Sequence, residues 1–349
     1  MFKENFKDFW GKNVSGMDIC DTLSDGADSD TLSNGAEIYT HTTDPTKNDT
    51  DADGMDDGWE VKYGLNPKSD DSGVDSDGDT LTNLQEYNLN TNPMSIDTDN
   101  DNIWDQNEIS LGTDPTNNDT DSDLMPDGYE FMNGLDPLTD DAGDDPDLDN
   151  LTNYEEYQNG TNPHNADSDN DNLKDGDEVK LYGTDPLDTD SDNDTMPDDW
   201  EVNNNLNPLS DDRLLDPDAD GLVNIYEYQN GTNPQDDDTD DDYLTDGAEV
   251  NTYGTNPTNN DTDSDNMLDG WEVANGLNPL SDDSGNDPDS DGLTNVQEYQ
   301  NNCDPQDSDT DDDTLTDGAE VNTHGTNPTN NDTDSDNMLD GWEVANGLN

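Results

Sequence analysis

A tandem-repeat solenoid of mostly irregular loops and short two-turn helices, without a conventional hydrophobic core, is the fold class that this sequence predicts. The first observation is a twelve-residue acidic pattern, Asp-x-Asp-x-Asp-x-apolar-x-(Asp/Asn)-x-x-Glu, which occurs thirteen complete times in 349 residues. The second is composition, because only 25% of the residues are hydrophobic. A short repeat cannot bury its apolar residues alone, so we expect each repeat to contact mainly its neighbours.

The acidic pattern has the ligand spacing of a calcium loop. In the copy at 261–272, carboxylates occupy positions 1, 3 and 5, position 7 offers a backbone carbonyl, position 9 is Asp269 and position 12 is Glu272. In EF-hand-type loops of this spacing, alternate residues turn inward and the last glutamate binds with both oxygens. Calcium accepts six to eight oxygens in loose geometry, whereas magnesium requires a tight octahedron. We therefore predict calcium, about one ion per complete loop and thirteen or more in all.

The thirteen complete loops share Asp at positions 1, 3 and 5, an apolar residue at position 7, Asp or Asn at position 9 and Glu at position 12. The predicted metal ligands are Asp49, Asp51, Asp53, Met55, Asp57, Glu60, Asp75, Asp77, Asp79, Leu81, Asn83, Glu86, Asp97, Asp99, Asp101, Ile103, Asp105, Glu108, Asp119, Asp121, Asp123, Met125, Asp127, Glu130, Asp145, Asp147, Asp149, Leu151, Asn153, Glu156, Asp167, Asp169, Asp171, Leu173, Asp175, Glu178, Asp190, Asp192, Asp194, Met196, Asp198, Glu201, Asp216, Asp218, Asp220, Leu222, Asn224, Glu227, Asp238, Asp240, Asp242, Leu244, Asp246, Glu249, Asp261, Asp263, Asp265, Met267, Asp269, Glu272, Asp287, Asp289, Asp291, Leu293, Asn295, Glu298, Asp309, Asp311, Asp313, Leu315, Asp317, Glu320, Asp332, Asp334, Asp336, Met338, Asp340 and Glu343. An incomplete copy ends at Glu37 and has Gly26 at position 1, so we expect a weak loop or a degenerate cap there.

Three kinds of repeat alternate along the chain. Successive loop glutamates from Glu60 onward are 22, 23 or 26 residues apart, so three units form a superrepeat of 70 or 71 residues. The GTNP unit ends in Gly-Thr-(Asn/Asp)-Pro. The Trp unit carries Gly-Trp-Glu-Val or a close variant and usually ends in Gly-Leu-(Asn/Asp)-Pro. The long unit has an inserted segment around Ser-Asp-Asp before its loop, and Asn at position 9.

Each unit is predicted to contain one short helix after its loop. Asp or Asn at position 9 is a good N-cap, and an acidic first turn suits the positive end of the helix dipole. Glycines such as Gly254 and Gly276 are expected to end these helices in the left-handed conformation, and the proline that follows prevents continuation. Turn-forming Thr-Asn-Asn-Asp and Asn-Pro sequences precede the loops, so no entering helix is expected.

The domain boundaries follow from the repeat pattern. Residues 1–20 form an N-terminal amphipathic segment, with Phe2, Phe6, Phe9 and Trp10 at helical spacing, which caps the first repeat or docks onto another subunit or surface. Residues 21–46 are the degenerate first repeat, and residues 47–349 are the tandem calcium repeats. The sequence stops within a repeat, so the array is expected to continue beyond residue 349.

Charge and composition exclude several functions. The formal net charge of −84 opposes binding to nucleic acid. Three histidines without a repeated Ser or Cys partner do not support an enzyme, and no signal peptide or membrane span is visible. Two cysteines, Cys20 and Cys303, form no disulfide framework, and they either join subunits or are neutral replacements. Such a chain is predicted to be disordered without metal, so calcium binding must be coupled to folding.

The repeat resembles the bacterial and archaeal thrombospondin type 3-like calcium repeats. The likeness rests on segments such as DTDDDYLTDGAEVNTYGTNP at 238–257 and covers about residues 47–349. It implies a secreted or surface-anchored stalk whose core is calcium, with calcium ligands at the positions given above. Family loops usually have Gly at position 6, whereas most loops here do not. We expect the least favourable loops to be those with Thr80, Leu124, Thr195, Tyr243 and Thr314 at that position.

Two further features recur with the repeat. An aromatic residue at 59, 129, 200, 271 and 342 either fills its own repeat, against Met267 and Leu277 or their equivalents, or lines one face for lateral association. Nine Asn-x-Ser/Thr sequons occur, and those at Asn48, Asn118, Asn260 and Asn331 occupy the same repeat position, directly before a loop. We treat glycosylation there as a hypothesis.

The predicted function is structural: a calcium-rigidified filament or stalk subunit at the cell surface, which self-associates into a filament or bundle. Extracellular calcium is millimolar, so loops of modest affinity stay filled there. One alternative is the spacer arm of a calcium-dependent adhesin or surface enzyme. Another is an acidic protein that stores calcium or nucleates mineral.

Overall fold

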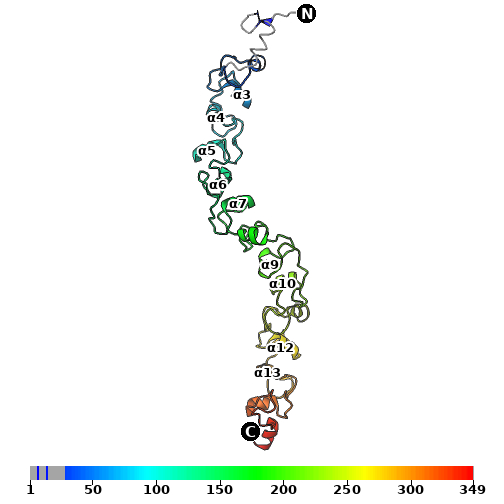
Figure 1. Cartoon of the computed structure of the whole chain (residues 1–349). Helices are drawn as coiled ribbons and strands as arrows, with labels where there is room; N and C mark the ends of the chain where they lie inside the picture. Colours follow the sequence, from blue (N-terminus) through cyan, green and yellow to red (C-terminus); the bar gives the residue numbers. More distant parts are fainter. Residues whose placement is uncertain (1–5, 8–12, 15–27, 349) are drawn as a thin grey trace. The chain divides into compact units, whose positions relative to one another are not determined.

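The computed structural model describes residues 6–7, 13–14 and 28–348, and nearly all of its secondary structure is short helix. The helices follow one another in chain order (Figure 1). They are α2 (Asn34–Ala36), η1 (Glu37–His41), α3 (Asp57–Tyr63), α4 (Asn83–Leu89), α5 (Asp105–Leu111), α6 (Asp127–Asn133), α7 (Asn153–Asn159), α8 (Asp175–Asp177), η2 (Glu178–Tyr182), α9 (Asp198–Asn203), α10 (Asn224–Asn230), α11 (Asp246–Ala248), η3 (Glu249–Tyr253), α12 (Asp269–Ala274), α13 (Asn295–Asn301), α14 (Asp317–Ala319), η4 (Glu320–His324) and α15 (Asp340–Asn346), where η marks a π-helical turn. One helix follows each loop and none precedes it in the described residues, as expected.

The N-terminal segment contains the two strands of the described residues. Strands β1 (Phe6–Lys7) and β2 (Asn13–Val14) pair antiparallel, with Phe6 opposite Val14. The predicted amphipathic helix is therefore wrong at Phe6 and Lys7, and its remaining residues lie outside the described ones. A helix of about twelve residues is marginal in water, and Asn13 favours turns and their flanks over a helix interior.

Each helix begins at loop position 9, one residue earlier than an N-cap at position 9 would place it. The N-cap is position 8, as at Thr152, whose hydroxyl accepts a hydrogen bond from the Glu155 N–H, while the Glu155 carboxylate accepts one from the Thr152 N–H. The prediction that position 9 is the cap was wrong by one residue. Its side chain bonds elsewhere, as described below.

Left-handed residues end most of the helices, as predicted, but α9 and α12 end at Asn204 and Asn275 with φ of −100° and −99°, and the left-handed Gly276 follows one residue later. Gly254 ends η3 with φ of 76°, and Asn90 and Asn302 take the same role with φ of 63° and 60°. In the incomplete first unit with Glu37 and in the GTNP units with Glu178, Glu249 and Glu320, one α-turn continues into a π-helical turn that starts at the loop glutamate. These units therefore accommodate one more residue before the Gly-Thr-(Asn/Asp)-Pro turn than the unit that contains α5.

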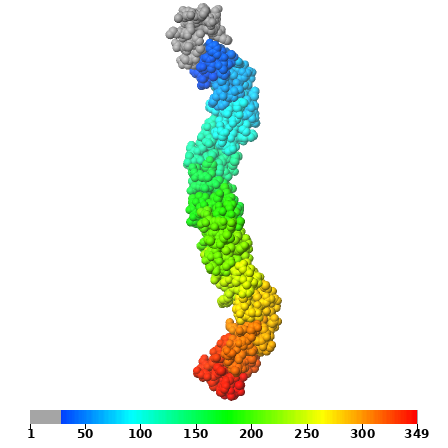
Figure 2. Space-filling model, turned by 90° about the vertical axis from the view of Figure 1, so that its right-hand side faces the viewer, coloured from blue at the N-terminus to red at the C-terminus, as the bar shows by residue number. Residues whose placement is uncertain are grey.

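The described chain divides into two compact units, and in each the repeats join mainly their neighbours. One unit comprises residues 1–168 and 174–176, and the other comprises 169–173 and 177–349. Within each unit, colour bands succeed one another in sequence order (Figure 2). Hydrogen bonds between repeats join residues about one repeat apart, such as Asp71 N–H to Asp53 Oδ2, 18 positions, and Gly270 N–H to Asp242 Oδ2, 28 positions.

The buried apolar core of the described residues consists of about one side chain per repeat. Its members are position 7 of the loops, plus one cysteine: Met55, Leu81, Ile103, Met125, Leu151, Leu173, Met196, Leu222, Leu244, Met267, Leu293 and Cys303. Most other buried side chains are acidic or amide groups of the loops. This arrangement fits a repeat protein without a conventional hydrophobic core.

The recurring aromatic residue of the Trp unit packs between repeats. Trp271 contacts Tyr299 of the following long unit edge to face, with ring centroids 5.0 Å apart, and Trp59 meets Tyr87 in the same way at 5.2 Å. Trp342, which has no following repeat in this sequence, is 49% exposed. The prediction that this residue fills its own repeat therefore missed its aromatic partner, which lies in the next repeat.

Candidate metal sites

Backbone N–H groups of each loop donate hydrogen bonds to the carboxylates at loop positions 1 and 5, and these bonds fold the loop. In loop 261–272, Asp261 accepts the N–H of Asp265 at 3.1 Å and that of Asn266 at 2.9 Å, on different oxygens. Asp265 accepts the N–H of Met267 at 3.1 Å. A carboxylate oxygen has two acceptor sites, so these bonds orient the carboxylates and leave acceptor capacity for a cation.

Two loop positions adopt the left-handed backbone. Position 6 has φ between 71° and 104° in all thirteen complete loops. The loops expected to be least favourable have φ values of 86°, 82°, 83°, 78° and 82° at Thr80, Leu124, Thr195, Tyr243 and Thr314. Position 4 is also left-handed, as at Ala52 with φ of 66° and Leu148 with 64°, a feature that the sequence analysis did not anticipate. Strained residues at both positions persist because the carboxylate bonds hold the loop around them.

The position-12 glutamates are buried, and most of them accept no hydrogen bond from the described protein groups, whereas Glu178, Glu227 and Glu249 each accept one from a threonine hydroxyl. No described protein group donates to either carboxylate oxygen in nine of them: Glu60, Glu86, Glu108, Glu130, Glu156, Glu201, Glu272, Glu298 and Glu320. Each of these nine glutamates is no more than 1% exposed. Burying a charged group without a hydrogen-bond partner costs several kcal/mol of folding free energy. A cation at this point would satisfy both oxygens, so the residues present fit a bound calcium ion.

The burial of these glutamates also raises their pKa values. Burial, followed by repulsion from the loop aspartates, raises the pKa of Glu60 and Glu108 to about 9 and that of Glu86 and Glu298 to about 8. For Glu60, the strongest repulsion comes from Asp53. A divalent cation removes both causes, because it replaces lost hydration and offsets the neighbouring charges.

The position-9 aspartates are held by position 2. Thr50 donates its N–H to Asp57 Oδ1 at 2.8 Å and its hydroxyl to Oδ2 at 2.6 Å. Ser168 and Ser191 make the same two bonds to Asp175 and Asp198. Position 2 is Thr or Ser in every loop with Asp at position 9, and this correlation could have been read from the sequence.

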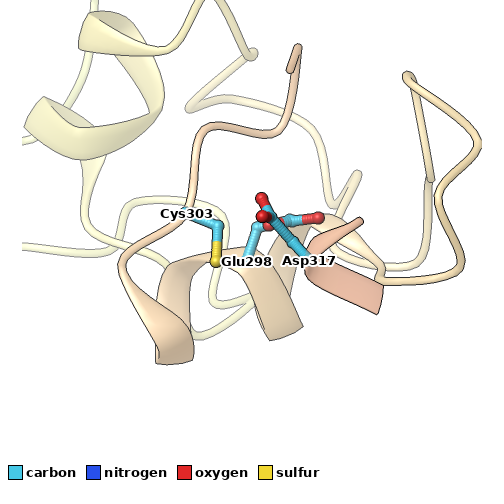
Figure 3. A group of neighbouring side chains, drawn as sticks. All are labelled: Glu298, Cys303 and Asp317. Atoms are coloured by element: carbon cyan, nitrogen blue, oxygen red, sulfur yellow. The ribbon is translucent and has the colours of Figure 1, made fainter. Parts of the chain in front are cut away.

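The same aspartate reaches the preceding repeat. One ligand atom each from Glu298, Cys303 and Asp317 lies within 4.8 Å of the others, although Asp317 belongs to the next loop (Figure 3). The carboxylates that repel Asp105 most are Asp79 and Asp77 of the preceding loop. Position 9 therefore lies between two loops, and its role as a ligand of its own loop stays a prediction.

Glycine at position 10 allows this close approach. The Gly128 N–H donates to Asp101 Oδ2 at 2.9 Å, and a Cβ added to Gly128 would lie 2.8 Å from the Asp101 carbonyl carbon and closer to its oxygen. Gly176, Gly247 and Gly341 each meet the corresponding aspartate backbone of the preceding loop. The motif within one repeat does not explain this glycine, because the constraint on it comes from a neighbouring repeat.

The structure brings the predicted ligands together in local groups. Positions 1, 3 and 5 form such groups, as with Asp49, Asp51 and Asp53. The incomplete first loop keeps one as well, with Asp28, Asp30 and Glu37 within 4.8 Å of one another. Glu37 is buried and no described group donates to either of its oxygens. This loop therefore retains three of its predicted ligand positions, although Gly26 replaces the first.

Cys303 occupies a position that is threonine in the other long units. It is 3% exposed and unpaired, and burial raises its thiol pKa. Thr91, Thr161 and Thr232 take this position elsewhere. A buried thiol beside two carboxylates is poorly placed to join subunits, which favours the neutral replacement. Cys20 lies outside the described residues.

These features define a class of protein: an acidic tandem-repeat protein whose loops are built to hold hard cations between oxygen ligands. Comparison with known families identifies the repeat. Six segments match the family described as Bacterial TSP3 repeat: residues 49–69, 97–118, 151–166, 167–189, 238–260 and 309–331. The chain therefore contains bacterial thrombospondin type 3 repeats at these six segments, and repeats of this family bind calcium.

The matches favour the GTNP units. Four of them cover the GTNP loops that end at Glu108, Glu178, Glu249 and Glu320. Searches among curated proteins and among solved structures gave no match. None of the helices among the described residues combines the length and apolar character needed to span a membrane.

Proposed function

We propose that this chain is a calcium-rigidified structural protein, a stalk or filament subunit outside the cell. The observation that carries the proposal is the set of nine buried position-12 glutamates whose carboxylate oxygens accept no hydrogen bond from any described group. Apolar burial is confined to about one side chain per repeat, so the ions supply most of the cohesion. The protein then forms a solenoid whose length grows by adding repeats.

The proposed location follows from calcium supply. Loops of modest affinity stay filled where calcium is millimolar, as it is outside cells. The formal charge of −84 is also reduced when each of thirteen loops binds one divalent ion. The role is non-enzymatic in this proposal, because the carboxylates are occupied by metal.

Electron microscopy and small-angle scattering test the proposal directly. The purified chain is imaged in millimolar calcium and after removal of calcium with a chelator. We expect particles of uniform length that assemble into fibres or bundles with calcium, and an expanded, heterogeneous chain without it. Particles that look the same in both conditions would contradict the proposal. Uniform single particles that never associate would favour the spacer arm, and bound mineral without uniform length would favour calcium storage.

Glycosylation at the repeated sequons is a further part of the proposal. Asn48, Asn118, Asn260 and Asn331 are all exposed, so a glycan could be accommodated. The threonine of each sequon has a structural role as well, because it occupies position 2 and donates to the position-9 aspartate. A mass of the native protein equal to that of the bare polypeptide would exclude glycosylation.

A further inference from the structure

The junction between a Trp unit and the following long unit is built differently from the other junctions. The residue at position 10 of the long unit is bulky, as at Leu84 and Tyr154. The helix of the long unit therefore cannot approach the preceding loop as closely as the helix that contains Gly128 does. Position 9 is Asn rather than Asp in every long unit of the array. The carboxylate that other junctions receive from position 9 is therefore missing here.

An aspartate of the inserted segment takes that place. One oxygen each from Asp53, Glu60 and Asp71 lies within 4.8 Å of the others, and Asp71 belongs to the insertion. The Asp71 N–H donates to Asp53 Oδ2 at 3.2 Å, which fixes the insertion against the preceding loop. The equivalent bonds join Asp212 to Asp194 and Asp283 to Asp265, both at 3.2 Å.

Asparagine at position 9 explains how this aspartate is held. The Asn83 amide donates to the Asp71 carbonyl at 3.0 Å. The amide also donates to the aspartate carboxylate, from Asn83 to Asp71 at 3.5 Å, from Asn153 to Asp141 at 3.2 Å and from Asn295 to Asp283 at 3.0 Å. An aspartate at position 9 would repel the inserted carboxylate, whereas an amide binds it.

The buried glutamate at this junction indicates a site for a bound ligand. Glu60 is fully buried and no described group donates to either of its oxygens, and the same holds for Glu130, Glu201 and Glu272. The inserted aspartate is among the carboxylates that repel each of them. A third carboxylate brought to such a group increases repulsion unless a cation lies among them.

We propose that Asp71, Asp141, Asp212 and Asp283 are calcium ligands that cross the junction, each completing a site with positions 5 and 12 of the preceding loop. The ion then joins two repeats directly. The inference rests on the proposed calcium-dependent structural function and assigns residues to it. It also gives the insertion of the long unit a role, namely to replace the position-9 carboxylate.

The test uses the full chain and two matched quadruple variants. The junction variant carries Asp71→Asn, Asp141→Asn, Asp212→Asn and Asp283→Asn, which keep size and backbone. The control carries Asp70→Asn, Asp140→Asn, Asp211→Asn and Asp282→Asn, which change the exposed neighbouring aspartates and the net charge equally. Calcium binding is measured by equilibrium dialysis and by circular dichroism during calcium titration.

We expect the half-saturating calcium concentration at these junctions to rise about tenfold in the junction variant, since ligand charge sets calcium affinity. The control should titrate like the natural chain. A junction variant that titrates like the control would overturn the assignment while leaving calcium-dependent folding, and thus the proposed function, intact. The single variant Asp71→Asn, followed by hydrogen exchange of residues 49–86 at limiting calcium, gives the same answer if the quadruple variant does not fold. Faster exchange there than in Asp70→Asn supports the proposal, and equal exchange contradicts it.

Discussion

Replacing Gly128 with alanine should loosen the junction between two repeats, although the same change usually stabilises a helix. The new Cβ would overlap the carbonyl group of Asp101, 2.8 Å from its carbon, and real Cβ atoms stay beyond about 3.0 Å. Relief requires the two repeats to separate, which breaks the bond from the Gly128 N–H to Asp101 Oδ2, now 2.9 Å long.

The magnitude follows from two opposing effects. A hydrogen bond to a charged group contributes about 1.5–3 kcal/mol. Alanine returns up to about 1 kcal/mol through its greater helix propensity. We therefore expect the free energy of local opening to fall by about 1–2 kcal/mol, which is a factor of about 5–30 in the open population.

Hydrogen exchange with mass spectrometry in saturating calcium measures this opening locally. Gln106→Ala is the matched control, because Gln106 occupies position 10 of the preceding loop and already carries a side chain, which bonds to Ser110 of its own helix. Exchange should accelerate in residues 97–130 of Gly128→Ala and change little in Gln106→Ala. Unchanged or slower exchange in Gly128→Ala would refute the argument that this glycine is required by the neighbouring repeat.

Three other predictions follow from the sites. Glu156→Gln should raise the calcium concentration needed for folding of its repeat by about tenfold or more, because it removes ligand charge. The control Glu155→Gln should leave that concentration unchanged, since Gln85 and Gln297 occupy the same position in other long units. Equal effects of the two variants in a calcium titration would contradict the role of Glu156. The glutamates with pKa raised to about 8 or 9 should make the calcium-free chain more compact at low pH, with that stabilisation complete below about pH 4.5 and lost as pH rises through 8 to 9. Calcium binding should conversely release protons and weaken as pH falls, and calorimetry in buffers of different ionisation enthalpy would show no proton release if this is wrong. Cys303 should react slowly with a thiol reagent in calcium and quickly after chelation, in a chain carrying Cys20→Ser; rapid reaction in both conditions would contradict its burial.

The fold and ligand pattern were largely predictable because they depend on local sequence. The left-handed backbone at position 6, the short helix after each loop and the glycine that ends it all follow from residues within one repeat. The N-cap was placed one residue too late because the position-9 side chain bonds to position 2 instead. A correlation between Thr or Ser at position 2 and Asp at position 9 was the available signal.

Contacts between repeats were less predictable, since no single repeat contains both partners. The constraint on Gly128 arises from the backbone of Asp101, and the partner of Trp271 is Tyr299 of the next unit. Likewise, Asn83 is predicted as a metal ligand of its own loop, and the bond from its amide to Asp71 of the insertion could not be foreseen from one loop.

The sequence by itself determined the repeat, the acidic loops and their spacing, because a hard cation requires oxygen ligands at positions that a twelve-residue loop can turn inward. Tertiary structure decided how the loops are joined. It placed a carboxylate from one repeat beside the buried glutamate of the repeat before it. This carboxylate comes from position 9 in the GTNP and Trp units and from the inserted segment in the long units. The physical reason is that burial removes water from that glutamate and leaves most of these carboxylates without a donor, so their surroundings are completed from the neighbouring repeat.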